Sequence, residues 1–144
     1  MIKLFLRFFV IILCIFLMAC GQSPGMVANV KVDTGTSDRF AQEEVEEAVD
    51  RVKEKFIDFR GCELLRLWYD EDWSNLFIES YMTAGRGSVN GVSRENVIVL
   101  LSNFEVNFSR GDGSLNPNST YYHWSWILIR DYENGPWRVD DWGY

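Results

Sequence analysis

The stretch YYHWSWILIRDYENGPWRVDDWGY (residues 121–144) predicts two β-strands joined by a five-residue link. The link contains Asn134-Gly135, and both residue types tolerate the positive φ angles that hairpin turns require. Large apolar side chains recur at every second position of the first strand and would share one face of a sheet: Tyr122, Trp124, Trp126 and Leu128. The stretch therefore predicts an antiparallel hairpin with a strongly aromatic face.

Two segments upstream of this hairpin have the composition of further strands. VIVLLSNFEVNF (residues 97–108) is apolar on both faces at its start and alternates from Phe104 onward, which is typical of a strand that is buried at one end. CELLRLWYDE (residues 62–71) predicts a strand with Leu64, Arg66 and Trp68 on one side and Leu65, Leu67 and Tyr69 on the other. Together these segments predict an antiparallel sheet of about four strands.

Two further segments have helical spacing. In FAQEEVEEAVDRVKEKFIDF (residues 40–59), apolar residues that would share one helical face recur every three or four positions: Val45, Val49, Val52, Phe56 and Phe59. A shorter helix is predicted over DWSNLFIESYMTA (residues 72–84), with Asp72 or Ser74 as its N-cap. The glycines and serines of residues 85–96 indicate a loop.

This order of elements predicts an α+β fold. We expect the N-terminal amphipathic helix to pack on a curled antiparallel sheet, with the short second helix beside it. Residues 39–144 have the length of one ordinary domain and contain all six Trp and all six Tyr of the chain.

The N-terminal residues have the features of a secretory signal. Lys3 and Arg7 precede twelve uninterrupted apolar residues, 8–19. As a helix this run would reach only about 18 Å, which is short of the roughly 30 Å hydrocarbon core of a bilayer. We therefore expect residues 1–19 to be a signal peptide, although an uncleaved anchor helix is an alternative.

Leu17-Met18-Ala19-Cys20 resembles the lipobox of bacterial lipoproteins. The resemblance implies cleavage before Cys20 and attachment of a diacylglycerol to its sulfur. Such acyl chains hold a protein on a bilayer without a spanning helix. We expect a lipid-anchored protein on the extracytoplasmic face of the cell membrane.

Residues 20–38 are rich in Gly, Ser, Thr and Asn and have little apolar rhythm. This composition predicts a flexible tether, with a short strand at residues 26–32 as an alternative. A chain of this length would have an r.m.s. reach of about 20–25 Å, enough to hold the domain clear of the lipid headgroups.

The segments ENVIVLLSNFEV and WSWILIRDYENGPWRVDDWGY resemble a family of small lipoproteins of unknown function from Gram-positive bacteria. The resemblance extends over residues 42–144 and is most specific in the closing residues 137–144. It implies a cone-shaped α+β fold of the nuclear-transport-factor-two-like kind. It carries over no catalytic or ligand residue.

Charge and cysteine content exclude several classes of protein. Removal of residues 1–19 takes away Lys3 and Arg7 and no acid, so the formal charge changes from −7 to −9. An acidic domain does not favour nucleic acid as a partner. Cys62 is the one cysteine outside the signal and the lipid attachment position, so we expect no intramolecular disulfide.

The sequence offers one sharp enzymatic hypothesis, in which His123 acts as acid or base with Asp70, Asp141 or Tyr81. The alternative is that His123 is an ordinary exposed strand residue. The acidic pairs and the run at residues 112–118 lack the spacing of a calcium loop. We therefore expect no metal and no cofactor.

Four tryptophans of the hairpin region admit two interpretations: Trp124, Trp126, Trp137 and Trp142. They could form the core beneath the long helix, which we favour because that helix must cover an apolar face. They could instead line a groove that stacks sugars or apolar ligands. Our leading hypothesis is a non-enzymatic binding or accessory module with a glycan, peptide or protein partner in the envelope. The alternatives are an enzyme of the cone fold and a structural protein that forms homodimers through its sheet.

Overall fold

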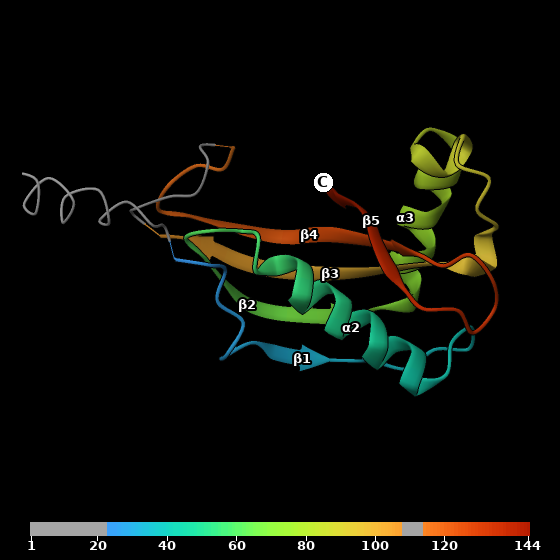
Figure 1. Cartoon of the computed structure of the whole chain (residues 1–144), viewed down its shortest axis with the longest axis horizontal. Coiled ribbons are helices and arrows are strands. Elements are labelled where there is room, and N and C mark those ends of the chain that lie inside the picture. The colour runs from blue at the N-terminus through green and yellow to red at the C-terminus, as the bar shows by residue number, and fades with distance from the viewer. Residues whose placement is uncertain (1–22, 108–113) are drawn as a thin grey trace, which may run out of the picture.

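The computed structural model describes residues 23–107 and 114–144, so the predicted signal peptide and Cys20 lie outside the described residues. The described chain contains one sheet with two α-helices and two short 3-10 turns (Figure 1). The elements are β1 (Lys31–Asp33), α2 (Gln42–Phe56), β2 (Cys62–Tyr69), α3 (Glu71–Thr83), η1 (Arg86–Ser88), η2 (Arg94–Asn96), β3 (Val97–Val106), β4 (Ser119–Ile129) and β5 (Arg138–Gly143). The predicted α+β class is confirmed.

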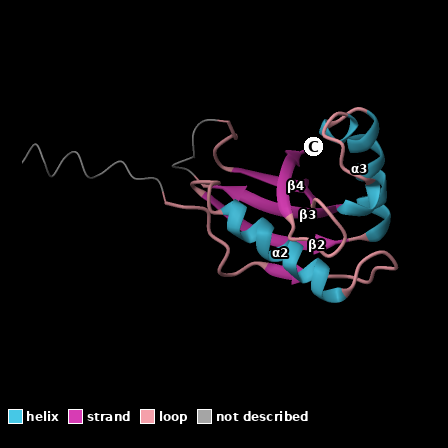
Figure 2. Cartoon of the chain, turned by 45° about the vertical axis from the view of Figure 1, so that its right-hand side comes forward, coloured by secondary structure: helices cyan, strands magenta, loops and turns pink. Residues whose placement is uncertain are grey.

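The sheet is open, and its five strands follow chain order from β1 to β5 (Figure 2). β2 to β5 pair antiparallel, as predicted, whereas β1 pairs with β2 in parallel. The prediction of about four antiparallel strands is corrected by β1, which comes from the segment predicted to be a tether. Its physical role is to pair the edge of β2, whose backbone groups would otherwise face solvent.

The N-terminal end of the described chain is also held against the domain. The Gly61 N–H donates a hydrogen bond to the Ser23 carbonyl at 2.9 Å, and the Gly25 N–H donates to the Ile57 carbonyl at 3.0 Å. The segment predicted as a flexible tether, residues 20–38, is therefore attached to the domain from Ser23 onward.

The hairpin of β4 and β5 forms as the sequence predicts. Ile129, the last residue of β4, pairs with Arg138, the first residue of β5, so the connection between the strands spans residues 130–137. Within the link, the Gly135 N–H donates to the Tyr132 carbonyl at 2.9 Å, and Asn134 adopts a φ of 59°. The turn thus uses the positive φ that Asn tolerates better than most residues.

A register shift in β2 changes the faces predicted from strict alternation. The shift lies between Leu64 and Arg66. As a result Leu64 shares the larger core with Leu67 and Tyr69, whereas the alternating pattern placed it with Arg66 and Trp68. An extra residue in one strand reverses the face of every residue that follows it, so periodicity alone gave the wrong side for Leu64.

A second bulge lies in β4, where Tyr122 and His123 together lie opposite Asn103. His123 adopts a φ of 56°, and its N–H donates to Asn103 Oδ1 at 3.0 Å. Tyr121, rather than the predicted Tyr122, therefore packs with Trp124, with ring centroids 5.6 Å apart.

Helix α2 packs across one face of the sheet and forms the larger core. Four of the five side chains predicted for its apolar face are buried: Val45, Val49, Val52 and Phe56. The fifth, Phe59, lies after the end of the helix and is partly buried against the same core. Trp126 of β4 is fully buried beneath the helix, and its Nε1 donates to Ser102 Oγ at 2.8 Å. Each fully buried large apolar side chain stabilises the fold by about 1.5–3 kcal/mol, so this layer is the main source of stability.

Helix α3 packs on the opposite face, over the end of the sheet where β3 begins. Alternate residues of β3 divide between the two sides, since Ile98 and Leu100 join the α2 core. Val97 and Val99 instead pack with Ile78 of α3 in a smaller core. The sheet is thus covered by one helix on each face.

The N-cap of α3 differs from the prediction. Asp70 caps the helix, because its Oδ1 accepts a hydrogen bond from the Trp73 N–H at 3.0 Å. The predicted caps were Asp72 and Ser74. Ser74 is buried instead, and its Oγ accepts from the Val99 N–H at 3.1 Å, which ties α3 to β3.

Arg130, the residue after β4, is a buried charge that joins three parts of the fold. Its guanidinium pairs with Glu44 of α2, and its Nε donates to Asn96 Oδ1 at 3.1 Å. The guanidinium carbon also lies 4.4 Å from the centroid of the Trp137 ring. Burial alone would raise the pKa of Glu44, but hydrogen bonds from Arg130 and the Ala41 N–H outweigh it and lower that pKa.

We expect Glu44→Gln to lower the free energy of unfolding by about 3 kcal/mol at neutral pH, because Arg130 would stay buried without a counter-charge. The folded-state pKa of Glu44 lies below its unfolded value, so its contribution is complete above about pH 4.3 and is lost as the pH falls through the folded pKa. The Glu44→Gln variant should not show this loss of stability as the pH falls. Urea denaturation across this pH range measures both effects.

The control is Glu79→Gln, which breaks a pair with Arg94 in which both side chains are exposed. Its cost should be under about 1 kcal/mol. Equal losses in the two variants would contradict a structural role for the buried pair.

Candidate functional site

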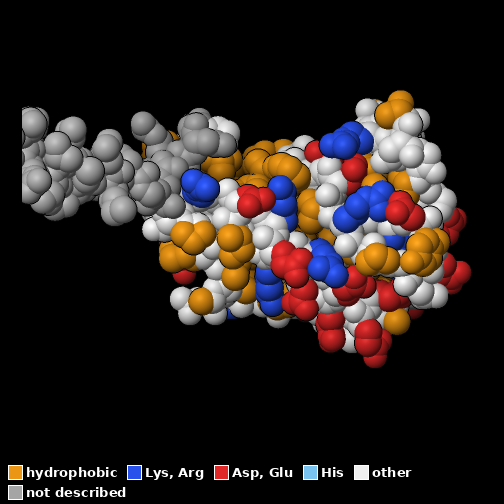
Figure 3. All heavy atoms as spheres, viewed as in Figure 1, with side chains coloured by type: hydrophobic (Ala, Val, Ile, Leu, Met, Phe, Trp, Pro, Cys, Tyr) orange, Lys and Arg blue, Asp and Glu red, His pale blue; other side chains and the backbone are white. Residues whose placement is uncertain are grey.

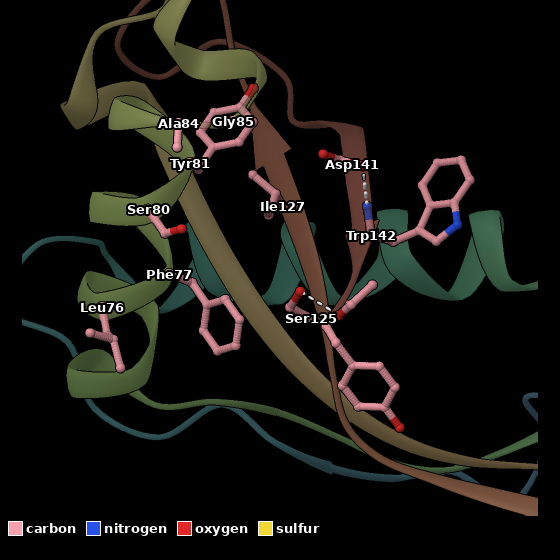
Figure 4. Close-up of a pocket in the computed structure, with 12 residues that line it drawn as sticks. Leu76, Phe77, Ser80, Tyr81, Ala84, Gly85, Ser125, Ile127, Asp141 and Trp142 are labelled. Carbon is pink, nitrogen blue, oxygen red and sulfur yellow. Dashed lines mark hydrogen bonds between the residues drawn. The ribbon is translucent and has the colours of Figure 1, made fainter.

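An open groove of about 400 Å³ lies between α3 and the β4–β5 part of the sheet (Figure 4). Figure 4 views the sheet from the side of α3, with the side chains of the helix on one wall and β4 and β5 on the other. The lining residues are Leu76, Phe77, Ser80, Tyr81, Ala84 and Gly85 from α3 and the residues after it, Ser125 and Ile127 from β4, and Asp141, Trp142, Gly143 and Tyr144 from β5 and its end.

The groove exists because α3 covers only part of its face of the sheet. Ile78 is buried against β3, while Phe77 and Ser80 line the space between α3 and β4. The opposite wall is fixed by Ser125, whose Oγ donates to the Gly143 carbonyl at 2.7 Å. Gly143 adopts a φ of 145°, a conformation that L side chains rarely take.

The rim of the groove is apolar and exposed. Leu76 has 63% of its surface exposed, and Tyr144 has 78%. Phe77 is partly buried and lies 6.1 Å, centroid to centroid, from Trp73 one turn earlier in α3. Exposed apolar surface around a concave site favours a ligand that removes it from water, at about 25 cal/mol per Å².

One end of the groove is polar and internally satisfied. The Tyr81 hydroxyl donates to Asp140 Oδ2 at 2.7 Å and accepts from Asn90 Nδ2 at 2.8 Å. Arg86 Nε lies 3.3 Å from the same oxygen of Asp140. Burial, and then the hydrogen bond to the Asp140 carboxylate, raise the pKa of Tyr81 above its ordinary value. The phenol therefore stays protonated and serves as a hydrogen-bonding group.

The structure brings two of the four proposed acid–base residues to the groove. Tyr81 and Asp141 line it, although Asp141 Oδ1 accepts from the Trp142 N–H and the partner of Tyr81 is Asp140. Neither His123 nor Asp70 lines the groove. The His123 ring contacts two indole rings near the start of α3, and Asp70 is engaged as the helix cap.

The four tryptophans singled out by the sequence lie in different environments. Trp126 and Trp137 are buried, and Trp124 is half-buried against Phe104. Trp142 is 42% exposed, but its ring points away from the groove in Figure 4 and lies beneath the Lys55 ammonium, 4.8 Å from the ring centroid. Of these four tryptophans, only Trp142 is part of the groove lining. The facing wall consists of residues of α3 and just after it, of which the sequence had singled out Tyr81 as a candidate acid–base group.

In the described part of the chain, no three His, Cys, Asp or Glu side chains gather in a way that could hold a metal ion.

No helix within residues 23–107 and 114–144 is both long and apolar enough to cross a bilayer.

The geometry defines a class of protein: a small mixed α+β domain with one helix on each face of an open sheet and an apolar groove beside the second helix. The chain belongs to the family described as Domain of unknown function (DUF4829), whose model matches residues 34–143. The matched region contains both α-helices and β2 to β5, and so all of the groove lining except Tyr144. No curated protein and no solved structure matches the chain.

We expect Tyr81→Phe to lower the free energy of unfolding by about 1–2 kcal/mol, because the Asn90 amide and the Asp140 carboxylate each lose a hydrogen-bond partner at a partly buried site. Chemical denaturation measures the change. Tyr132→Phe, at an exposed tyrosine of the β4–β5 link, is the matched control and should change stability by less than about 0.5 kcal/mol. A loss no larger than that of the control would mean that the Tyr81 cluster does not support this end of the groove.

Proposed function

We propose that this chain is a lipid-anchored, extracytoplasmic binding or accessory module without enzymatic activity, and that its ligand occupies the groove between α3 and β5. The observation that carries the proposal is the groove itself, with the exposed apolar side chains of Leu76 and Tyr144 at its rim. Apolar pockets with a few polar groups are the usual form of ligand sites. The ligand is an apolar or amphipathic molecule, because most of the lining is carbon.

The arrangement of polar groups supports binding over catalysis. Within the groove the Tyr81 phenol is held protonated by Asp140, and the one histidine of the chain is not part of the lining. General acid–base catalysis needs groups with suitable pKa values around one reacting proton. Ser80 and Ser125 contribute the hydroxyl groups of the groove. The Ser125 hydroxyl already donates a hydrogen bond to the Gly143 carbonyl.

The lipid anchor is supported by the sequence Leu17-Met18-Ala19-Cys20 behind a short apolar run. The family match begins at residue 34, downstream of this segment.

The likeness to cone-shaped folds of the nuclear-transport-factor-two-like kind is part of the same proposal. Its support is that α2 crosses one face of the curled sheet (Figure 1).

For the groove, we expect Ser80→Trp to abolish binding of the neutral fluorescent probe N-phenyl-1-naphthylamine, because an indole at this exposed position of α3 would fill the space. Fluorescence titration of the mature chain measures the affinity. Tyr132→Trp places an indole of the same size on the distant β4–β5 link and should bind the probe like the wild type. If the wild type does not enhance the fluorescence, or if Ser80→Trp binds as well as the wild type, the groove is not the binding site.

For the anchor, we expect Cys20→Ala to lose incorporation of a palmitate analogue and to move from the membrane fraction to the soluble fraction. The measurement is metabolic labelling followed by fractionation in a bacterial host that modifies lipoproteins. Cys62→Ala is the matched control, since that thiol is buried and should not affect the label. Label retained after Cys20→Ala would rule out this anchor.

A further inference from the structure

The folded domain begins very close to the proposed lipid. The Ser23 carbonyl is hydrogen-bonded to Gly61 at the start of β2, and Ser23 is only three residues after Cys20. A chain of three residues spans at most about 11 Å even when it is fully extended. This limit is well below the reach of the long tether that the composition of residues 20–38 predicts.

We propose that the end of the domain around the start of β2 docks directly on the bilayer that holds the lipid, a proposal that rests on the proposed anchor at Cys20. The docking surface is formed by Met26, Ile57 and Arg60 and is called the base. Gly25, next to Met26, donates a hydrogen bond to the Ile57 carbonyl, and Arg60 precedes Gly61. The three residues therefore surround the point at which the chain enters the domain.

The chemistry of the base fits a layer of lipid headgroups. Met26 and Ile57 each have 43% of their surface exposed, and the apolar parts of such side chains are favoured at the boundary of headgroups and acyl chains. Arg60 is exposed and forms no ion pair among the described residues. A guanidinium without a partner is available to lipid phosphate, which it can bind with two hydrogen bonds.

The charges of α2 are distributed unevenly along its length. Acidic side chains gather at the N-terminal end of the helix, and basic ones such as Lys53 and Lys55 lie at the C-terminal end, next to the base. Figure 3 shows most of the acidic side chains of this face in the half of the molecule away from the point where the chain enters the domain, although some lie nearer to it. Fifteen residues of helix separate the two ends by about 22 Å.

Screening decides how strongly an anionic membrane acts on each end of the helix. The Debye length at physiological salt is about 8 Å, so the acidic end lies more than two Debye lengths beyond the base. The basic end lies within the range of the surface potential. Lys53 and Lys55 are, however, paired with Asp50 and Asp58, so the short link to the lipid and the apolar contacts of the base, rather than a net positive charge, would hold this end on the membrane.

Docking in this orientation directs the groove away from the membrane. The base adjoins Cys62, which pairs with Val106 at the end of β3, while α3 packs on Val97 and Val99 at its beginning. The ten residues of β3 extend about 30 Å. The groove would thus extend from the middle of the sheet, where Ser125 lies opposite Leu101, toward the end of the domain that faces away from the lipid.

The test uses the lipidated full-length chain in vesicles of phosphatidylethanolamine and phosphatidylglycerol that contain a lipid with a nitroxide near its headgroup. Ile57→Cys and Val89→Cys each carry one fluorescent label, and Val89 is an exposed residue just after η1, at the α3 end of the domain. Cys62 is buried and should not react with the label, so the chain without an introduced cysteine measures the background labelling. We expect several-fold stronger quenching at position 57 than at position 89.

Two further variants separate docking from simple proximity. A flexible Gly/Ser insert between Gln22 and Ser23 should reduce quenching at position 57 while the protein still floats with the vesicles, because the base is no longer forced onto the surface. Arg60→Glu should also reduce it. Equal quenching at the two positions, or quenching unchanged by the insert, would overturn the orientation and leave the anchor intact. A wild-type chain that does not float with vesicles would overturn the anchor, and the docking proposal with it.

Discussion

Strand β3 is buried on both of its faces, and this constraint organises the whole domain. Its residues from Val97 to Ser102 are all buried, so each face of the sheet must be covered. Helix α2 crosses one face and forms the larger core, whereas α3 covers only the end of the other face. The part of β4 that α3 leaves uncovered becomes a wall of the groove. The candidate groove therefore exists because α2 covers one apolar face of the sheet, whereas α3 covers only part of the other.

The two ends of the sheet have different chemistry. At one end the chain enters the domain beside Gly61, and the basic end of α2 lies nearby. At the other end α3 and the residues after it form the groove, with the polar cluster of Tyr81 and Asp140 behind it. The buried Arg130 joins this far end to the N-terminus of α2 through Glu44, so the helix is fixed along the sheet rather than only resting on it.

Particular residues show why some features followed from periodicity and others did not. Val45, Val49 and Val52 lie on one face of α2 because helical spacing is a local property. Alternation placed Tyr122 on the strand face of Trp124 and Trp126, but the bulge at His123 gives that place to Tyr121. The composition of residues 20–38 favoured a tether over a short strand, because a short edge strand such as β1 can consist of exposed residues. The sequence singled out the groove residues Tyr81 and Asp141 as acid–base candidates but not Asp140, because only the packing of the folded chain brings this residue of β5 to the Tyr81 hydroxyl.

By itself the sequence determined the α+β class, the two helices and the hairpin at Asn134-Gly135, because each depends on the spacing of apolar residues or on local turn chemistry. It also contains Leu17-Met18-Ala19-Cys20, whose resemblance to a lipobox depends only on a linear motif. Only the tertiary structure decided that the segment from Ser23 onward is held against the domain, which strand residues face each helix, and that an open groove lies beside α3. These features arise from register shifts and from packing between distant segments, and no local pattern of residues encodes the relative position of two surfaces that meet only after folding.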